Sequence, residues 1–161
     1  MATIYNFADS TVWPKGLDDI EPTEKFFVWA FRCWAIGSRN PDKPHINAVW
    51  DRFLRELGPT NGKNALSNLI TMFDTLRTHP NRDIYHHEPQ CKCLSVDEVL
   101  LIFMIGSCRR HERAIARYFA HQLVQPGGVD ELVETSWLLA QSLNDYLAGS
   151  GSSIDVQNTL H

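Results

Sequence analysis

Apolar residues recur every three or four positions along most of this chain, and this spacing limits its fold more than any other feature. Two segments carry the pattern most clearly, at Ile46, Val49, Trp50, Phe53, Leu54 and Leu57, and then at Leu66, Leu69, Ile70, Phe73 and Leu76. Such spacing gathers apolar side chains on one face of a helix, and Gly58 ends the first helix. No segment alternates with the period of two that a half-buried strand requires. The sequence therefore predicts an all-α protein.

Two other segments are apolar on nearly all sides, which predicts helices that are largely buried. The first spans residues 23–36, where Arg32 interrupts a run of apolar residues. The second spans residues 96–107 and follows Ser95, which forms a capping box with Glu98. Together with the amphipathic segments, these helices predict a compact bundle of five or six helices.

The second buried helix is followed by two more amphipathic helices. Cys108 to Leu123 continues directly from it, and the pair Gly106-Ser107 marks the expected kink or break between them. The segment Gln125-Pro126-Gly127-Gly128 ends that helix, and a last amphipathic pattern runs over residues 129–147.

Length and composition predict one domain with irregular ends. The chain has 161 residues, of which 43% are hydrophobic, and this is enough to bury one core without disulfides or metal. We assign residues 1–148 to a single helical domain, with residues 1–22 as an irregular arm. The segment 149–161 begins with glycine and serine, and we expect it to be a flexible tail.

Histidine and cysteine residues gather just before the second buried helix. His87, Cys91 and Cys93, with His86 beside them, are the ligand types that zinc takes in tetrahedral sites. We predict a zinc ion with a structural or switching role in the loop 79–93, where it would fix the loop at the start of the next helix. One Cys-x-Cys is weaker evidence than two Cys-x-x-Cys pairs, so a loop without metal is the competing interpretation.

The spacing leaves the fourth zinc ligand open. The candidates are His86, His79, Glu88, Cys33 and His45. Cys108 would be on the order of 20 Å from Cys93 if the intervening helix were straight, and it could join only through a break at Gly106. A second interpretation is a reversible disulfide between Cys91 and Cys93, because the N–H groups at a helix start favour a thiolate. That ring would be strained.

Arginines recur every four residues along the helix predicted from Cys108 to Leu123. Arg109, Arg113 and Arg117 would form a ridge along one helix face and contact a phosphate, a nucleic acid or an acidic helix. The alternative is a solvated face, paired with Glu112 or with the acidic residues Asp18 and Asp19. No helix-turn-helix pattern precedes the ridge.

An enzyme is the rival class, and the sequence gives it little support. The chain has no Gly-rich phosphate loop, no Gly-x-Ser-x-Gly and no His-Glu-x-x-His, so we assign no catalytic residue. A cofactor-binding helical enzyme would have to use histidines inside the bundle, and His45, His111 and His121 are the candidates.

Charge and hydropathy give the expected location. The formal charge of −4 disfavours nucleic acid and anionic membranes as bulk partners. The longest apolar run, residues 99–106, is far shorter than the roughly 20 residues of a membrane-spanning helix. No secretory signal is visible, and four cysteines in such a chain are typical of reduced thiols, so we expect a cytoplasmic protein.

These observations favour an intracellular interaction or regulatory module over an enzyme. We expect a protein partner, and a homodimer through an apolar helix face is a further interpretation. Zinc is the only cofactor that the sequence suggests. Trp13 lies outside the periodic segments, so we expect it to cover the bundle or to contact a partner.

Overall fold

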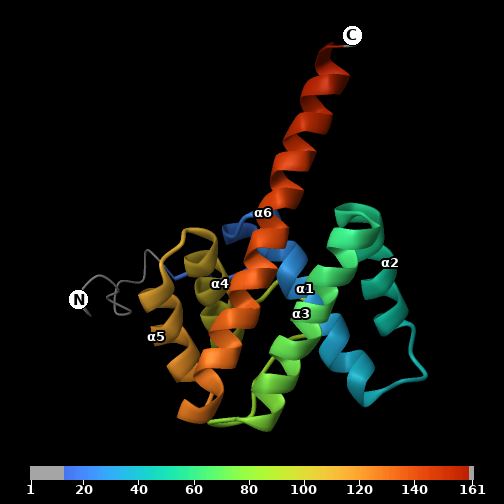
Figure 1. The fold of residues 1–161 in the computed structure, drawn as a ribbon. Helices are drawn as coiled ribbons and strands as arrows, with labels where there is room; N and C mark the ends of the chain where they lie inside the picture. Colours follow the sequence, from blue (N-terminus) through green and yellow to red (C-terminus); the bar gives the residue numbers. More distant parts are fainter. Residues whose placement is uncertain (1–12, 160–161) are drawn as a thin grey trace.

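The computed structural model describes residues 13–159, with side chains through Asn144, and this part of the chain forms a bundle of helices (Figure 1). Its α-helices are α1 (Pro22–Arg39), α2 (His45–Leu57), α3 (Pro59–Thr78), α4 (Val96–Arg109), α5 (Arg113–Leu123) and α6 (Val129–Thr159). Short 3₁₀ turns at Leu17–Asp19 and Pro126–Gly128 precede α1 and α6. Within residues 13–159 there is no strand, only two isolated bridges. The predicted all-α class is confirmed.

Helix α6 organises the bundle. It contacts α2, α3, α4 and α5, and its most extensive contact is with α3. In Figure 1, α3 lies on one side of α6, and α4 and α5 lie on the other. Helix α1 packs most extensively against α2 and also contacts α3 and α4. The C-terminal part of α6 extends beyond the other helices in this view.

The two helices expected to be buried are α1 and α4. In both, side chains on nearly all sides have lost contact with solvent, as the apolar sequence requires. Phe26 and Phe31 of α1, and Leu101 and Ile105 of α4, belong to one continuous core. The same two helices bury charge, because Arg32 is 0% exposed and Glu98 is 1% exposed. This pair forms the centre of the candidate site.

The break expected at Gly106 and Ser107 lies a few residues further along. Helix α4 continues to Arg109, and within it the Ser107 hydroxyl donates to the Phe103 carbonyl (2.8 Å). The chain turns at residues 110–112, where His111 adopts a left-handed φ of 60°. The predicted continuous helix from Cys108 is therefore wrong, and α5 begins only at Arg113.

The N-terminal arm packs on the bundle where it is described. The Trp13 ring meets the Phe103 ring edge-on, with centroids 5.6 Å apart. Gly16 pairs with Cys93, and the Leu17 N–H donates to the Lys92 carbonyl (2.8 Å). A side chain at Gly16 would place its Cβ 2.7 Å from the Lys92 oxygen, so glycine is required for this approach. Trp13 thus covers the bundle, which was one of the two roles expected for it; the other was contact with a partner.

The predicted division into a domain of residues 1–148 and a tail of residues 149–161 stays a prediction. Residues 1–12 of the expected arm lie outside the described residues. The backbone of α6 reaches Thr159, and the side chains of the expected tail are not among those described, so its flexibility stays a prediction. No helix in the described part of the chain has both the length and the apolar character to cross a membrane.

Candidate functional site

The segment between α3 and α4, residues 79–95, lacks regular secondary structure, yet hydrogen bonds hold both of its ends. We call it the α3–α4 loop. At its start, the Gln125 N–H donates to the His79 carbonyl (2.8 Å), and the Asn81 amide donates to the Val124 carbonyl (2.8 Å). At its far end, the loop pairs with the arm at Gly16. These contacts fix the loop between α5 and the arm.

The middle of the loop is held by one buried arginine. The Arg32 guanidinium donates to the carbonyl oxygens of Cys91 and Cys93, each at 2.7 Å. It also donates to both carboxylate oxygens of Glu98, from Nε at 2.6 Å and from Nη2 at 3.0 Å. We call Arg32, Glu98 and these two carbonyl groups the Arg32 cluster. Its planar fork joins α1, the loop and α4 at one point.

Glu98 completes its hydrogen bonds with backbone groups at the start of α4. Its carboxylate accepts from the N–H of Ser95 (2.9 Å) and of His87 (3.3 Å). Ser95 accepts in turn from the Glu98 N–H (3.1 Å), which is the predicted capping box. Burial raises the pKa of Glu98, but the hydrogen bonds from Arg32 and Ser95 outweigh it and leave that pKa below 4.5. The Glu98 carboxylate is therefore ionised at neutral pH.

Asp97 fastens the part of the loop nearest the pocket described below. Its buried carboxylate accepts from the Tyr85 N–H (2.8 Å) and from Arg82 Nη1 (2.8 Å). The Ser95 hydroxyl donates to the Tyr85 carbonyl (2.6 Å). The first turn of α4 thus binds both backbone groups of Tyr85.

The predicted zinc ligands do not come together. His86 contacts Arg39, the His87 ring packs edge-on against Tyr85 at 5.2 Å, and Cys93 is exposed while Cys91 is half-buried. Among the residues that the structure describes, no three His, Cys, Asp or Glu side chains are grouped so that they could hold a metal ion. The arrangement of these residues does not fit a zinc site, and zinc binding stays a prediction from sequence. The Arg32 cluster instead holds the loop at the start of α4.

The other cysteines are buried in the core. Burial raises the pKa of Cys33 to about 11 and that of Cys108 to about 12. Both side chains are therefore neutral thiols at physiological pH and pack as small apolar groups.

The three histidines proposed for a cofactor are not inside the bundle. His111 and His121 are exposed, and His45 is half-buried at the start of α2. The His111 ring packs on Trp137 with centroids 5.1 Å apart. The premise of an interior histidine site is therefore wrong for these residues, because the turn before α5 exposes His111 and the outer face of α5 carries His121.

The predicted arginine ridge is also divided, because the same turn separates Arg109 on α4 from Arg113 and Arg117 on α5. Arg109 donates to the Asn144 side chain (3.0 Å) and to Glu21 (3.4 Å). The two arginines of α5 pair with acidic residues of α6, Arg113 with Glu134 (3.4 Å) and Arg117 with Asp130 (2.5 Å). Arg110, beside Arg109 in the chain, pairs with Glu112 (2.6 Å), as the solvated-face alternative proposed, whereas neither Asp18 nor Asp19 is the partner of Arg109, Arg113 or Arg117.

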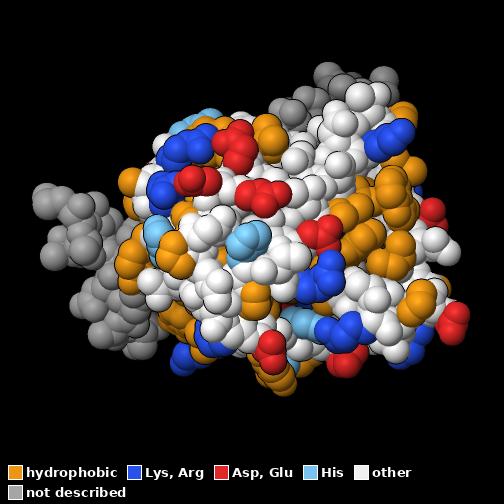
Figure 2. All heavy atoms as spheres, turned by 60° about the horizontal axis from the view of Figure 1, so that its bottom comes forward, with side chains coloured by type: hydrophobic (Ala, Val, Ile, Leu, Met, Phe, Trp, Pro, Cys, Tyr) orange, Lys and Arg blue, Asp and Glu red, His pale blue; other side chains and the backbone are white. Residues whose placement is uncertain are grey.

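On the face drawn in Figure 2, positive and negative side chains are also interspersed. In Figure 2, Lys and Arg side chains alternate with Asp and Glu side chains over the face drawn. No broad area of one sign is visible there, so this face offers no track for a nucleic-acid backbone.

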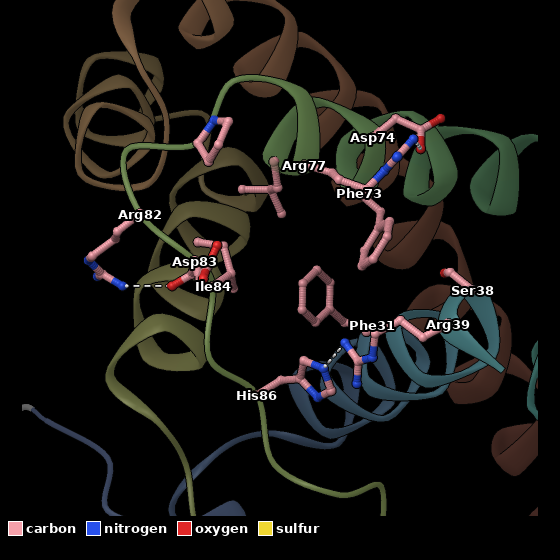
Figure 3. Close-up of a pocket in the computed structure, with 13 residues that line it drawn as sticks. Phe31, Ser38, Arg39, Phe73, Asp74, Arg77, Arg82, Asp83, Ile84 and His86 are labelled. Atoms are coloured by element: carbon pink, nitrogen blue, oxygen red, sulfur yellow. Dashed lines mark hydrogen bonds and ion pairs between the residues drawn. The ribbon is translucent and has the colours of Figure 1, made fainter.

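A pocket of about 760 Å³ lies between the C-terminal ends of α1 and α3 and the α3–α4 loop (Figure 3). We call it the α1–α3 pocket. Its apolar lining comes from Phe31, Ala35, Phe73, Leu76, Pro80 and Ile84. The ring centroids of Phe31 and Phe73 are 5.6 Å apart, and the two rings form the aromatic floor of the pocket. Its polar lining is Ser38, Arg39, Asp74, Arg77, Arg82, Asp83 and His86.

Arg39 and His86 meet at the rim of this pocket, as Figure 3 shows. Arg39 Nη1 lies 3.1 Å from His86 Nε2, and His86 Nδ1 lies 3.1 Å from the His87 carbonyl oxygen. A guanidinium only donates and a carbonyl only accepts, so the neutral imidazole with its proton on Nδ1 satisfies both contacts. His86 is therefore a rim residue of the pocket that orients Arg39.

Arg32 and Arg39 did not stand out in the sequence as site residues. Arg32 was visible only as a charge within an apolar run, and that is the signal that could have identified it, because a buried arginine requires a buried partner. Arg39 lies near a helix end, where a basic residue is ordinary. The pocket joins residues from three distant segments, and no local pattern indicates it.

No protein family, curated protein or solved structure matches this chain. The site must therefore be interpreted from its own geometry.

Proposed function

We propose that the protein is a cytoplasmic interaction module that binds an extended segment of a partner protein at the α1–α3 pocket. The observation that carries this proposal is the pocket itself, about 760 Å³ with an aromatic floor and a polar rim. Binding sites are typically concave, about 300–1,000 Å³, mostly apolar, and edged by a few polar groups that fix orientation. A large apolar side chain of the partner would fill the floor between Phe31 and Phe73.

The backbone beside the pocket supports a peptide as the occupant. Ile84 and His86 line the pocket, while the rings of Tyr85 and His87 contact each other, and this alternation is typical of extended chain. The N–H groups of Tyr85 and His87 are bound by Asp97 and Glu98. Within the described part of the chain, the backbone groups of Ile84 and His86 have no hydrogen-bond partner. A partner in extended conformation would supply one.

The contacts of the loop support a preformed site. Asp97 and Ser95 bind both backbone groups of Tyr85, and the Arg32 cluster holds residues 91 and 93. A loop already fixed in its binding conformation loses little conformational entropy when the partner binds. This is the role that the sequence suggested for a metal, and the proposal needs no metal.

The cysteines support the cytoplasm as the location. All four, Cys33, Cys91, Cys93 and Cys108, are free thiols, and this suits a reducing compartment.

Selection from a library of random peptides displayed on phage tests the proposal. The full chain is the bait, and recovered peptides are then measured as synthetic peptides against the wild type and Ser38→Trp. Ser38 is exposed at the pocket, so tryptophan there would fill the cavity without disturbing the core. We expect peptides that bind the wild type and lose at least about tenfold in affinity for Ser38→Trp.

Ser67→Trp is the matched control, because Ser67 is an exposed serine on α3 that does not line the pocket. Peptides should bind this variant as they bind the wild type. Recovery of no specific peptide, or binding that Ser38→Trp leaves unchanged, would overturn the proposal.

A further inference from the structure

The charges around the α1–α3 pocket differ in whether they already have a partner. Arg82 pairs with the buried carboxylate of Asp97, so its charge is already neutralised by an ion pair. Arg77 pairs with Asp74 at 3.5 Å, and both side chains are more than half exposed. Arg39 has no carboxylate partner among the described residues. It is the one cation of the pocket lining, within the described chain, whose charge is left unpaired.

Arg39 is also held at the rim by its contact with His86. Its Nη1 donates to His86 Nε2 at 3.1 Å, which orients the guanidinium and leaves its remaining N–H groups for a ligand. An arginine fork matches the two oxygens of a carboxylate. The aromatic floor at Phe31 lies next to it in the same pocket, as Figure 3 shows.

Resting on the proposed function, we infer that the partner segment carries an aspartate or glutamate next to its large apolar side chain, and that Arg39 binds this carboxylate. The apolar side chain enters the pocket over Phe31 and Phe73, and the acid stays at the rim on the α1 side. The acidic groups Asp74 and Asp83, elsewhere in the lining, would repel an acid placed beside them. Charge thus sets the direction in which the peptide lies.

The peptides recovered from the phage library provide the test. Displayed peptides carry no phosphate and no free C-terminus, so any acid they share is aspartate or glutamate. We expect an acidic residue beside an aromatic or large aliphatic residue. Replacing that acid by its amide should weaken binding to the wild type about fivefold at low salt, and less at high salt.

Arg39→Gln should reduce affinity for the acidic peptide by the same factor and leave affinity for the amide peptide unchanged. The Arg39 substitution and the acid-to-amide change remove the same contact, the one between Arg39 and the carboxylate. Arg39→Glu should prefer the peptide with lysine in place of the acid. Arg55→Gln is the matched control, since Arg55 is an exposed arginine of α2 outside the pocket, and it should bind like the wild type.

The outcomes separate the two proposals. One outcome is a set of peptides that bind the wild type and lose binding to Ser38→Trp, and yet share no acidic residue or bind Arg39→Gln as well as the wild type. Such peptides would overturn the role of Arg39 and leave the proposed interaction module standing. Recovery of no pocket-binding peptide would overturn both.

Discussion

Arg32 and Arg117 both pair with a carboxylate, but one pair is inside the protein and the other is at its surface. Arg32 is 0% exposed and contacts Glu98 and two loop carbonyls, whereas the side chain of Arg117 is 44% exposed and that of its partner Asp130 is 89% exposed. Water can replace every contact of Arg117, whereas the contacts between Arg32 and Glu98 are buried inside the protein. The comparison teaches that burial, rather than clustering of charge, decides which arginine the fold depends on.

Arg32→Ala should produce the largest loss of stability. It leaves the Glu98 carboxylate buried without its cation and two loop carbonyls without a donor, and breaking a buried pair in this way costs about 3–5 kcal/mol. The free energy of unfolding, measured by urea denaturation, gives the value. Arg32→Lys should recover only part of it, because an ammonium has three N–H groups on a single nitrogen and cannot reach all four acceptor oxygens. A loss below about 1 kcal/mol for Arg32→Ala would contradict this account.

Glu98→Gln should show a smaller loss and a changed dependence on pH. Hydrogen bonds hold the pKa of Glu98 below 4.5 in the folded protein. The Glu98 carboxylate therefore contributes fully to the free energy of unfolding above pH 4.5, and this contribution is lost as the pH falls through the pKa of the folded state. The wild type should therefore lose stability over that acid range, and Glu98→Gln should lose less.

Urea denaturation at a series of pH values measures the Glu98 effect, and Glu88→Gln, at an exposed carboxylate of the same loop, is the control. At neutral pH we expect Glu98→Gln to cost about 2–3 kcal/mol, because glutamine keeps an acceptor for Arg32 but not the charge. An acid profile identical to that of the wild type would show that Glu98 does not titrate as described.

Arg117→Ala should have the smallest effect, with no measurable change in the urea midpoint. Its pair with Asp130 lies in water, where the attraction is screened and two flexible side chains must be held in place. A midpoint shift as large as that of Glu98→Gln would remove the distinction between the two arginines.

The sequence predicted the helices better than the site. Helical spacing identified the bundle, and the Ser95 capping box located the start of α4, because both depend on residues a few positions apart. The turn at His111 was missed, since glycine at position 106 is a stronger local signal than a histidine in a left-handed conformation. That one error produced both the continuous arginine ridge and the interior position of His111.

The site itself depends on contacts between distant residues. The loop before α4 was correctly identified as restrained at the helix start, but its restraint was assigned to a metal rather than to Arg32. Ligand-type side chains attract attention in a sequence, whereas the groups that Arg32 binds in the loop are backbone carbonyls, which every residue possesses. The α1–α3 pocket likewise depends on how α1, α3 and the loop pack.

The Gly16 pairing and the Arg32 cluster also bear on how the protein folds. Arg32 is separated from its carbonyl partners by 59 and 61 positions in the chain. Such distant contacts carry a large loop-closure cost and form only after the intervening chain has been brought together. The α3–α4 loop, although irregular, cannot open without exposing a buried ion pair of the core. We therefore expect it to unfold in the same cooperative step as α1 and α4, so that the hydrogen-bonded amides of Tyr85, His87 and Ser95 exchange with solvent as slowly as those of the helices.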